Sequence, residues 1–255
     1  MNVFFHIFFT VAGAAVGSFL NVLICRLPES QSIIFPSSHC PKCKHRIRFY
    51  DNIPIISYLV LRGRCRDCHE KISFRYPAVE AITAVISLFL FLKFGISLKY
   101  LFAFLFSSAL IVITFIDFDH QIIPDVITLP GIPIFFLVAV FFMDVPFLDA
   151  LLGILIGGGV LFAIAFLYEI ITKREGMGGG DIKLLAMLGA FLGWKSLFFI
   201  LFVSSLLGAV VGISLMIAKG RDMKYAVPFG PFLSVAALAY LFVNIDVIEL
   251  LYFRF

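Results

Sequence analysis

Two aspartates each stand at the boundary of a long apolar run. Asp117 follows the run 101–116, and Asp181 follows a glycine run and opens another apolar stretch. Two nearby carboxylates cannot both ionise cheaply, so such a pair shares a proton and can supply one acid and one base. A helix beginning near Asp181 would also bring its positive N-terminal end to that carboxylate. The pattern indicates general acid–base chemistry at the edge of a hydrophobic bundle.

Three consecutive glycines, Gly178, Gly179 and Gly180, precede Asp181. Helix capping is the alternative explanation for an isolated aspartate at a helix start. A cap needs no glycine run, whereas glycines permit unusual backbone conformations and close approach of another group. The glycines therefore favour a functional site at Asp181.

Other acidic residues compete with Asp117 for a role in such a site. Asp125 follows Pro124 and precedes an apolar stretch, so helix capping explains it. Asp119 is two residues from Asp117 and would point elsewhere on a helix. Glu80 lies four residues into an apolar stretch, where it could pair with a basic residue or contribute to a site. The sequence favours Asp117 and leaves Glu80 open.

Four cysteines form two Cys-x-x-Cys pairs, Cys40 with Cys43 and Cys65 with Cys68, which are 21 residues apart. Two such pairs can offer four thiolates to one tetrahedral zinc ion. A redox pair is the alternative, but a catalytic metal is disfavoured because four thiolates leave no open coordination position. Nearby histidines could replace a cysteine ligand; they are His39, His45 and His69. We predict one structural zinc ion in a reducing compartment.

The composition indicates a polytopic membrane protein. The 255 residues are 62% hydrophobic and 14% charged, whereas soluble domains are closer to half apolar and a quarter charged. The sequence predicts an all-α fold with about eight spans, at 3–25, 77–92, 98–116, 128–143, 147–171, 182–194, 196–218 and 226–246. The span 182–194 is short, so a tilted segment, a re-entrant segment or one merged with its neighbour is an alternative there.

Basic residues are unevenly distributed between the predicted loops. Residues 26–76 hold ten of the twenty Lys and Arg residues and carry a net charge of +6. With the N-terminus outside, sixteen basic residues fall on the cytoplasmic side and four on the other. The basic loop therefore reflects topology and contact with anionic lipid, and it predicts no nucleic-acid partner. This topology places Asp117 and Asp181 at the cytoplasmic face.

Several stretches together resemble the type IV prepilin peptidases, which are leader peptidases and N-methyltransferases. The stretches occur in the order of that family, at 17–28, 40–68 with Asp51-Asn-Ile-Pro54 inside it, 74–80, 116–125 and 176–194. The resemblance implies an aspartic peptidase of the Gly-x-Gly-Asp type, with Asp117 and Asp181 as its catalytic pair. It also implies methylation of the new N-terminus by S-adenosylmethionine.

The same resemblance implies the substrates and the location. The substrates would be prepilins and type II secretion pseudopilins, cleaved after glycine at the cytoplasmic face of the bacterial inner membrane. The expected domains are a first span (1–25), a zinc-binding loop associated with methyl transfer (26–76) and a peptidase bundle (77–255). A proton-coupled transporter that uses the two aspartates as a relay leaves the cysteine loop unexplained. A scaffold held to a partner by that loop leaves the glycine run unexplained.

Overall fold

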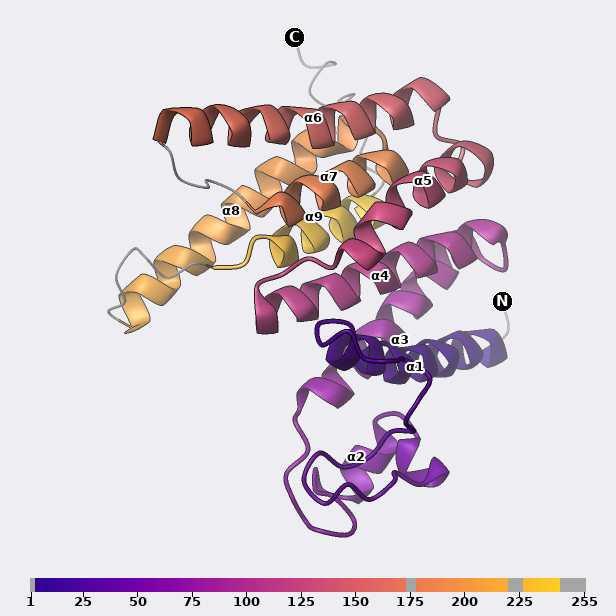
Figure 1. Ribbon diagram of the computed structural model, residues 1–255. Helices are drawn as coiled ribbons and strands as arrows, with labels where there is room; N and C mark the ends of the chain where they lie inside the picture. The colour runs from indigo at the N-terminus through magenta and orange to yellow at the C-terminus, as the bar shows by residue number, and fades with distance from the viewer. Residues whose placement is uncertain (1–2, 173–177, 220–226, 244–255) are drawn as a thin grey trace. The chain divides into compact units, whose positions relative to one another are not determined.

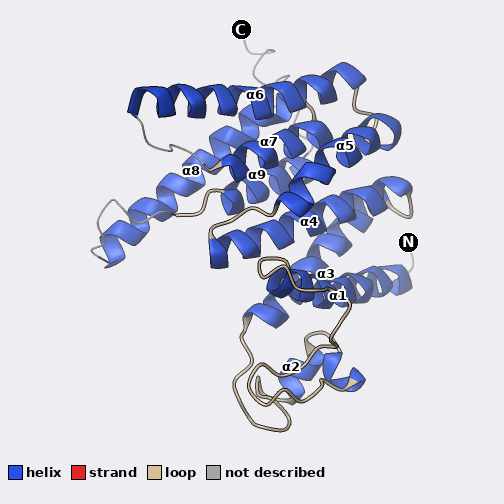
Figure 2. Cartoon of the chain, viewed as in Figure 1, coloured by secondary structure: helices blue, strands red, loops and turns tan. Residues whose placement is uncertain are grey.

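The computed structural model describes residues 3–172, 178–219 and 227–243. Within these ranges the chain forms helices and loops without a strand (Figure 2), and β pairing is limited to two isolated bridges. The predicted all-α class is confirmed for this part of the chain. The chain divides into two compact units, Met1–Val112 and Ile113–Phe255.

Six of the described helices are long and apolar enough to cross a membrane. They are α1 (Val3–Arg26), α3 (Arg75–Phe94), α4 (Leu98–His120), α5 (Asp125–Phe142), α6 (Phe147–Thr172) and α8 (Trp194–Lys219). The other two predicted spans coincide with α7 (Gly179–Leu192) and α9 (Gly230–Val243), which have 14 residues each. Such helices are about 21 Å long, whereas a hydrocarbon core is about 30 Å thick. A count of eight spans therefore stays a prediction.

Some sequence predictions concern residues outside the described part. They are the ends of the predicted span 226–246, the glycine-run flank at 176–177, and the basic residues Lys173, Arg174, Arg221, Lys224 and Arg254.

In the first unit, α1 and α3 pack closely against each other (Figure 1). The contact depends on a small residue of α1, because a Cβ added at Gly17 would lie 2.7 Å from Cα of Glu80. One turn later, Asn21 Nδ2 donates to the Tyr76 carbonyl at 3.1 Å. The polar segment between these helices contains the short helices η1 (Phe49–Asn52) and α2 (Ile56–Val60).

In the second unit, α7 is the central helix (Figure 1). It packs against α5, α6, α8 and α9, and every residue from Leu184 to Phe191 is buried. The helix lies close to α6 because Gly153 and Gly189 let the two backbones touch. This packing holds the start of α7, which carries Asp181, in a fixed place within the unit.

Candidate functional site

Asp117 lies in the last turn of α4 and is buried, with 5% of its surface exposed. The backbone N–H of Gly230, the first residue of α9, donates to Asp117 Oδ2 at 3.0 Å. A buried carboxylate is costly without hydrogen-bond partners, and the first amides of a helix have no partner within the helix. The start of α9 therefore supplies a donor to Asp117 from 113 residues further along the chain.

Asp181 lies in the first turn of α7 and is half-buried. It is outside the six helices with spanning length. Burial, and after it the negative charge of Asp117, raise the pKa of Asp181 to about 6. The two carboxylates are thus close enough to influence each other, as the sequence analysis expects of a pair that shares a proton.

The side chain of Ile123, in the loop between α4 and α5, joins the starts of α7 and α9. A Cβ added at Gly180 would lie 2.9 Å from Ile123 Cβ, and one added at Gly230 would lie 3.1 Å from Ile123 Cδ1. The Cβ at Gly230 would also lie 2.6 Å from Asp117 Oδ2. Only glycine fits at these two positions without displacing a neighbour, so both aspartates belong to one closely packed region.

The glycine run does not use left-handed backbone. Gly178 is the N-cap of α7 with φ −64° and ψ 132°, and Gly179 and Gly180 are already helical. A Cβ at Gly179 would have no heavy atom within 4 Å, and one at Gly178 would only reach Asp181 Oδ2 at 3.9 Å. Close approach at Gly180 is therefore the one physical requirement for glycine in this run.

The competing acidic residues are in different surroundings. Asp125, the first residue of α5, accepts hydrogen bonds from Lys183 Nζ at both carboxylate oxygens, at 2.7 and 2.8 Å. Asp125 therefore forms an ion pair between α5 and α7. The N-cap position of α5 is occupied by Pro124, and no side-chain capping hydrogen bond is formed there. Asp119 is exposed. Neither has the buried position of Asp117.

In the first unit, the four cysteines that sequence analysis pairs come together. The Sγ atoms of Cys40, Cys43, Cys65 and Cys68 all lie within 4.8 Å of one another, and among the described residues this is the group that could hold a metal ion. The Cys40 and Cys68 sulfurs are 3.7 Å apart. Tetrahedral coordination with zinc–sulfur bonds of about 2.3 Å requires sulfurs about 3.8 Å apart. The donor set therefore fits zinc, and no histidine joins the cluster.

The two Cys-x-x-Cys pairs have the same local backbone structure. In the first, Cys40 N–H donates to His45 O at 3.0 Å, and Lys44 N–H donates to Cys40 O at 2.9 Å. In the second, Cys65 N–H donates to Glu70 O at 2.8 Å, and His69 N–H to Cys65 O at 3.1 Å.

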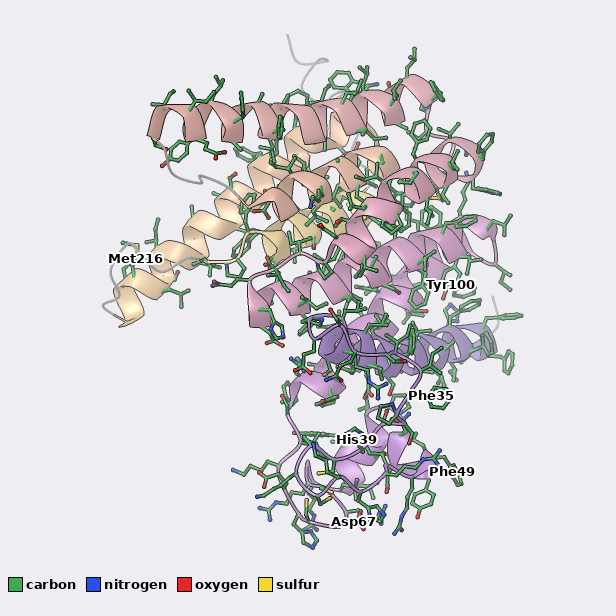
Figure 3. All side chains as sticks on the ribbon, in the orientation of Figure 1. Phe35, His39, Phe49, Asp67, Tyr100 and Met216 are labelled. Atoms are coloured by element: carbon green, nitrogen blue, oxygen red, sulfur yellow. The ribbon has the colours of Figure 1, made fainter. Side chains whose placement is uncertain are left out.

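The residue after each second cysteine has positive φ, 59° at Lys44 and 56° at His69. Figure 3 marks the two parts of the loop with His39 and Asp67. Arg66 Nε also donates hydrogen bonds to the two carboxylate oxygens of Asp51, at 2.9 and 3.1 Å. These bonds connect the second cysteine pair to the segment that lies between the two pairs. Arg66 lowers the pKa of Asp51 through these hydrogen bonds.

Glu80, which the sequence leaves open, is buried in α3. Its Oε2 accepts a hydrogen bond from the Ile55 backbone N–H at 2.8 Å. Ile55 has φ 62° and precedes α2, a conformation that is unfavourable for a β-branched residue. Glu80 therefore fastens the polar segment to a membrane helix, which is a structural contact in the first unit.

Two residues of the site, Gly230 and Ile123, are not evident from the sequence patterns. Gly230 stands in Pro228-Phe229-Gly230-Pro231, directly before an apolar stretch. A glycine beside a proline at a helix start is a recognisable signal, but its partner Asp117 is remote in sequence. Ile123 is an apolar residue in an apolar chain and carries no signal of its own.

Comparison with known proteins agrees with this arrangement of sites. Residues 11–94 match the family model of the bacterial peptidase A24 N-terminal domain, and residues 104–213 match that of the type IV leader peptidase family. The first match contains the four cysteines, and the second contains Asp117 and Asp181. Comparison with the solved structures found no match.

Curated relatives resemble the chain over most of its length. A protein of Pseudomonas putida named prepilin leader peptidase/N-methyltransferase is 40% identical over 249 residues, which cover 89% of this chain and 86% of the relative. Proteins of the same name from Neisseria gonorrhoeae and Pseudomonas aeruginosa are 41% and 36% identical over 253 and 247 residues. These matches cover 89% and 88% of this chain and 86% and 85% of the relatives. The chain therefore belongs to the type IV leader peptidase family.

Proposed function

We propose that this protein is a membrane aspartic endopeptidase that removes the short basic leader of type IV prepilins and type II secretion pseudopilins. The cut follows a glycine, and the new N-terminal residue is then methylated with S-adenosylmethionine as the methyl donor. The observation that carries the proposal is the buried Asp117 beside Asp181, in a chain whose relatives are named prepilin leader peptidase/N-methyltransferase.

The two carboxylates perform the cleavage as a pair that shares one proton. The ionised carboxylate takes a proton from a water molecule, whose oxygen attacks the carbonyl carbon of the scissile peptide. The protonated carboxylate gives its proton to the leaving nitrogen as the carbon–nitrogen bond breaks. The packing of Ile123 against Gly180 and Gly230 holds the two carboxylates in the required positions.

The site suits a substrate with a hydrophobic helix after the cut. We place Asp117 and Asp181 at the cytoplasmic face of the bacterial inner membrane, because the charge bias of the loops favours that side. The substrate helix would lie in the bilayer beside the enzyme, with the leader in the cytoplasm. The many exposed apolar side chains of α6 and α8 are consistent with a lipid environment.

The four-cysteine loop would hold one zinc ion through Cys40, Cys43, Cys65 and Cys68. Bound zinc stabilises a fold by joining its ligands, and it supplies no open coordination position here. The loop is the largest polar feature of the chain, and we assign to it the methyl transfer that follows cleavage. The bilayer and the pilin-type substrate are the partners, and no nucleic acid is involved.

Two alternatives differ from this proposal in measurable ways. A proton-coupled transporter would use Asp117 and Asp181 without proteolysis, and no comparison supports that function. A scaffold would need the zinc loop alone. The deciding experiment incubates the purified protein with a prepilin and S-adenosylmethionine, and measures the masses of both products. A leader ending in glycine and a mature chain heavier by one methyl group support the proposal, whereas unchanged prepilin contradicts it.

A further inference from the structure

The contact between Gly230 and Asp117 makes the two carboxylates unequal. We propose that Gly230 is a positioning residue that keeps Asp117 ionised, so that Asp117 activates the water and Asp181 holds the shared proton. This assignment rests on the proposed peptidase function and adds to it the separate roles of base and acid.

The group that binds Asp117 can act only as a hydrogen-bond donor. A backbone N–H can only donate, so at 3.0 Å from Oδ2 it requires an unprotonated oxygen there. The next residue, Pro231, has no N–H, which leaves Gly230 as the amide that the start of α9 directs at the carboxylate. Hydrogen bonds to a charged acceptor are roughly twice as strong as neutral ones. The contact therefore favours the ionised form of Asp117.

Asp181 lacks a matching donor. In the described part of the chain, no hydrogen bond to its carboxylate is formed, and its own N–H donates to Gly178 O at 3.1 Å. Helix dipoles alone do not favour this assignment, because Asp181 lies in the first turn of α7, whereas Asp117 lies in the last turn of α4 as well as beside the start of α9. The hydrogen bond from Gly230 is the contact that favours an ionised Asp117. Burial is costly for both carboxylates, but Gly230 offsets that cost at Asp117, whereas Asp181 has no such donor and also meets the charge of Asp117. The proton that the pair shares therefore resides on Asp181.

Other charged groups do not reverse this asymmetry. Among its described residues α9 has no charged side chain, and Asp125 of α5 and Lys183 of α7 bind each other. Lys195 of α8 follows the opposite end of α7 from Asp181. On α4 itself, Asp119 and His120 are exposed.

The assignment specifies each proton in the reaction. Asp117 takes one proton from the water as its oxygen bonds to the peptide carbon. Asp181 gives its proton to the nitrogen as the carbon–nitrogen bond breaks, and the second water proton stays on the new carboxyl group. The pair returns to its starting state when a proton passes from Asp117 to Asp181, directly or through water.

The most direct test removes the donor without adding atoms. Glycolic acid in place of Gly230, introduced by nonsense suppression in a cell-free system with lipid discs, replaces the N–H by an oxygen. Prepilin cleavage is then measured between about pH 4 and pH 9. The acidic limb of the profile reports loss of the first proton from the pair, and the basic limb reports loss of the second.

We expect the acidic limb to move to higher pH by about one unit or more, and the basic limb to stay in place. Gly230→Ala displaces the same carboxylate and should lower cleavage at least about tenfold when rates are compared at equal amounts of folded protein. The control is Gly212→Ala in α8, where a Cβ would have no heavy atom within 4 Å.

Movement of the basic limb alone would make Asp181 the base and overturn the assignment. A pH profile in which neither limb moves would overturn the assignment as well, because the ionisation of Asp117 would then not depend on the Gly230 N–H. Failure of the wild-type protein to cleave at any pH would instead refute the proposed function itself, so the two failures are distinguishable.

Discussion

Substitution of Gly180 by alanine should impair cleavage, whereas the same change at the adjacent Gly179 should not. A Cβ at Gly180 would lie 2.9 Å from Ile123 Cβ, and one at Gly179 would have no heavy atom within 4 Å. Neither residue has positive φ, so the comparison isolates close packing from backbone strain. The two variants form a matched pair within one glycine run.

The size of the effect follows from the contact. Carbon atoms pack at about 3.5–4.0 Å, so Gly180→Ala must separate α7 from Ile123 by about 0.5–1 Å. Such overpacking costs about 1–3 kcal/mol of stability. A misplacement of about 1 Å at reacting groups can cost about 100-fold in rate. Because Asp181 is the next residue, we expect at least about a tenfold loss of cleavage.

The assay is the initial rate of prepilin cleavage at equal amounts of folded protein. Thermal unfolding of the purified variants serves as the folding control, and methyl transfer to a pre-cleaved pilin checks that the other compact unit, which holds the zinc loop, is intact. Gly179→Ala should stay within about threefold of wild type, as expected for an open helical position. Equal losses at Gly179 and Gly180 would refute the packing argument and favour a requirement for backbone freedom.

The cysteine loop allows two further predictions. Replacement of Cys65 and Cys68 by serine should release zinc and impair methyl transfer, measured by metal mass spectrometry and a methylation assay; normal methylation after zinc loss would contradict it. Asp51→Asn should lower the free energy of unfolding of the loop by about 1 kcal/mol. Because Arg66 lowers the pKa of Asp51, this stability is fully present above the ordinary carboxyl pKa and is lost only at more acidic pH. Hydrogen exchange should give a constant difference from wild type between about pH 5.5 and pH 8, and a difference that shrinks across this window would refute the assignment.

Sequence patterns locate features whose cause is local. Apolar runs predict helices, and each of the eight predicted ranges overlaps a helix among the described residues. The Cys-x-x-Cys spacing predicts a cluster because each pair forms a short turn. These predictions succeed because each signal is contained in a few neighbouring residues.

Long-range contacts are not predictable in the same way. The start of α9 reaches Asp117 from 113 residues away, and no periodicity in either helix encodes that meeting. The sequence likewise cannot distinguish Gly180 from Gly179, because the difference is made by Ile123 from another element. Glu80 accepts a hydrogen bond from the backbone amide of Ile55. Because every residue except proline has such an amide, the residue type gives no sign of this contact.

Cleavage by Asp117 and Asp181 as a pair requires both carboxylates. The most direct measurement is the product mass spectrum of a prepilin incubated with Asp117→Asn, Asp181→Asn or the control Asp119→Asn, whose side chain is exposed. Asparagine keeps the shape of aspartate but cannot share the proton. The first two variants should remain folded and leave the prepilin uncut, and the third should cleave it. Full cleavage by either of the first two, with the Asp119 variant inactive, would contradict it.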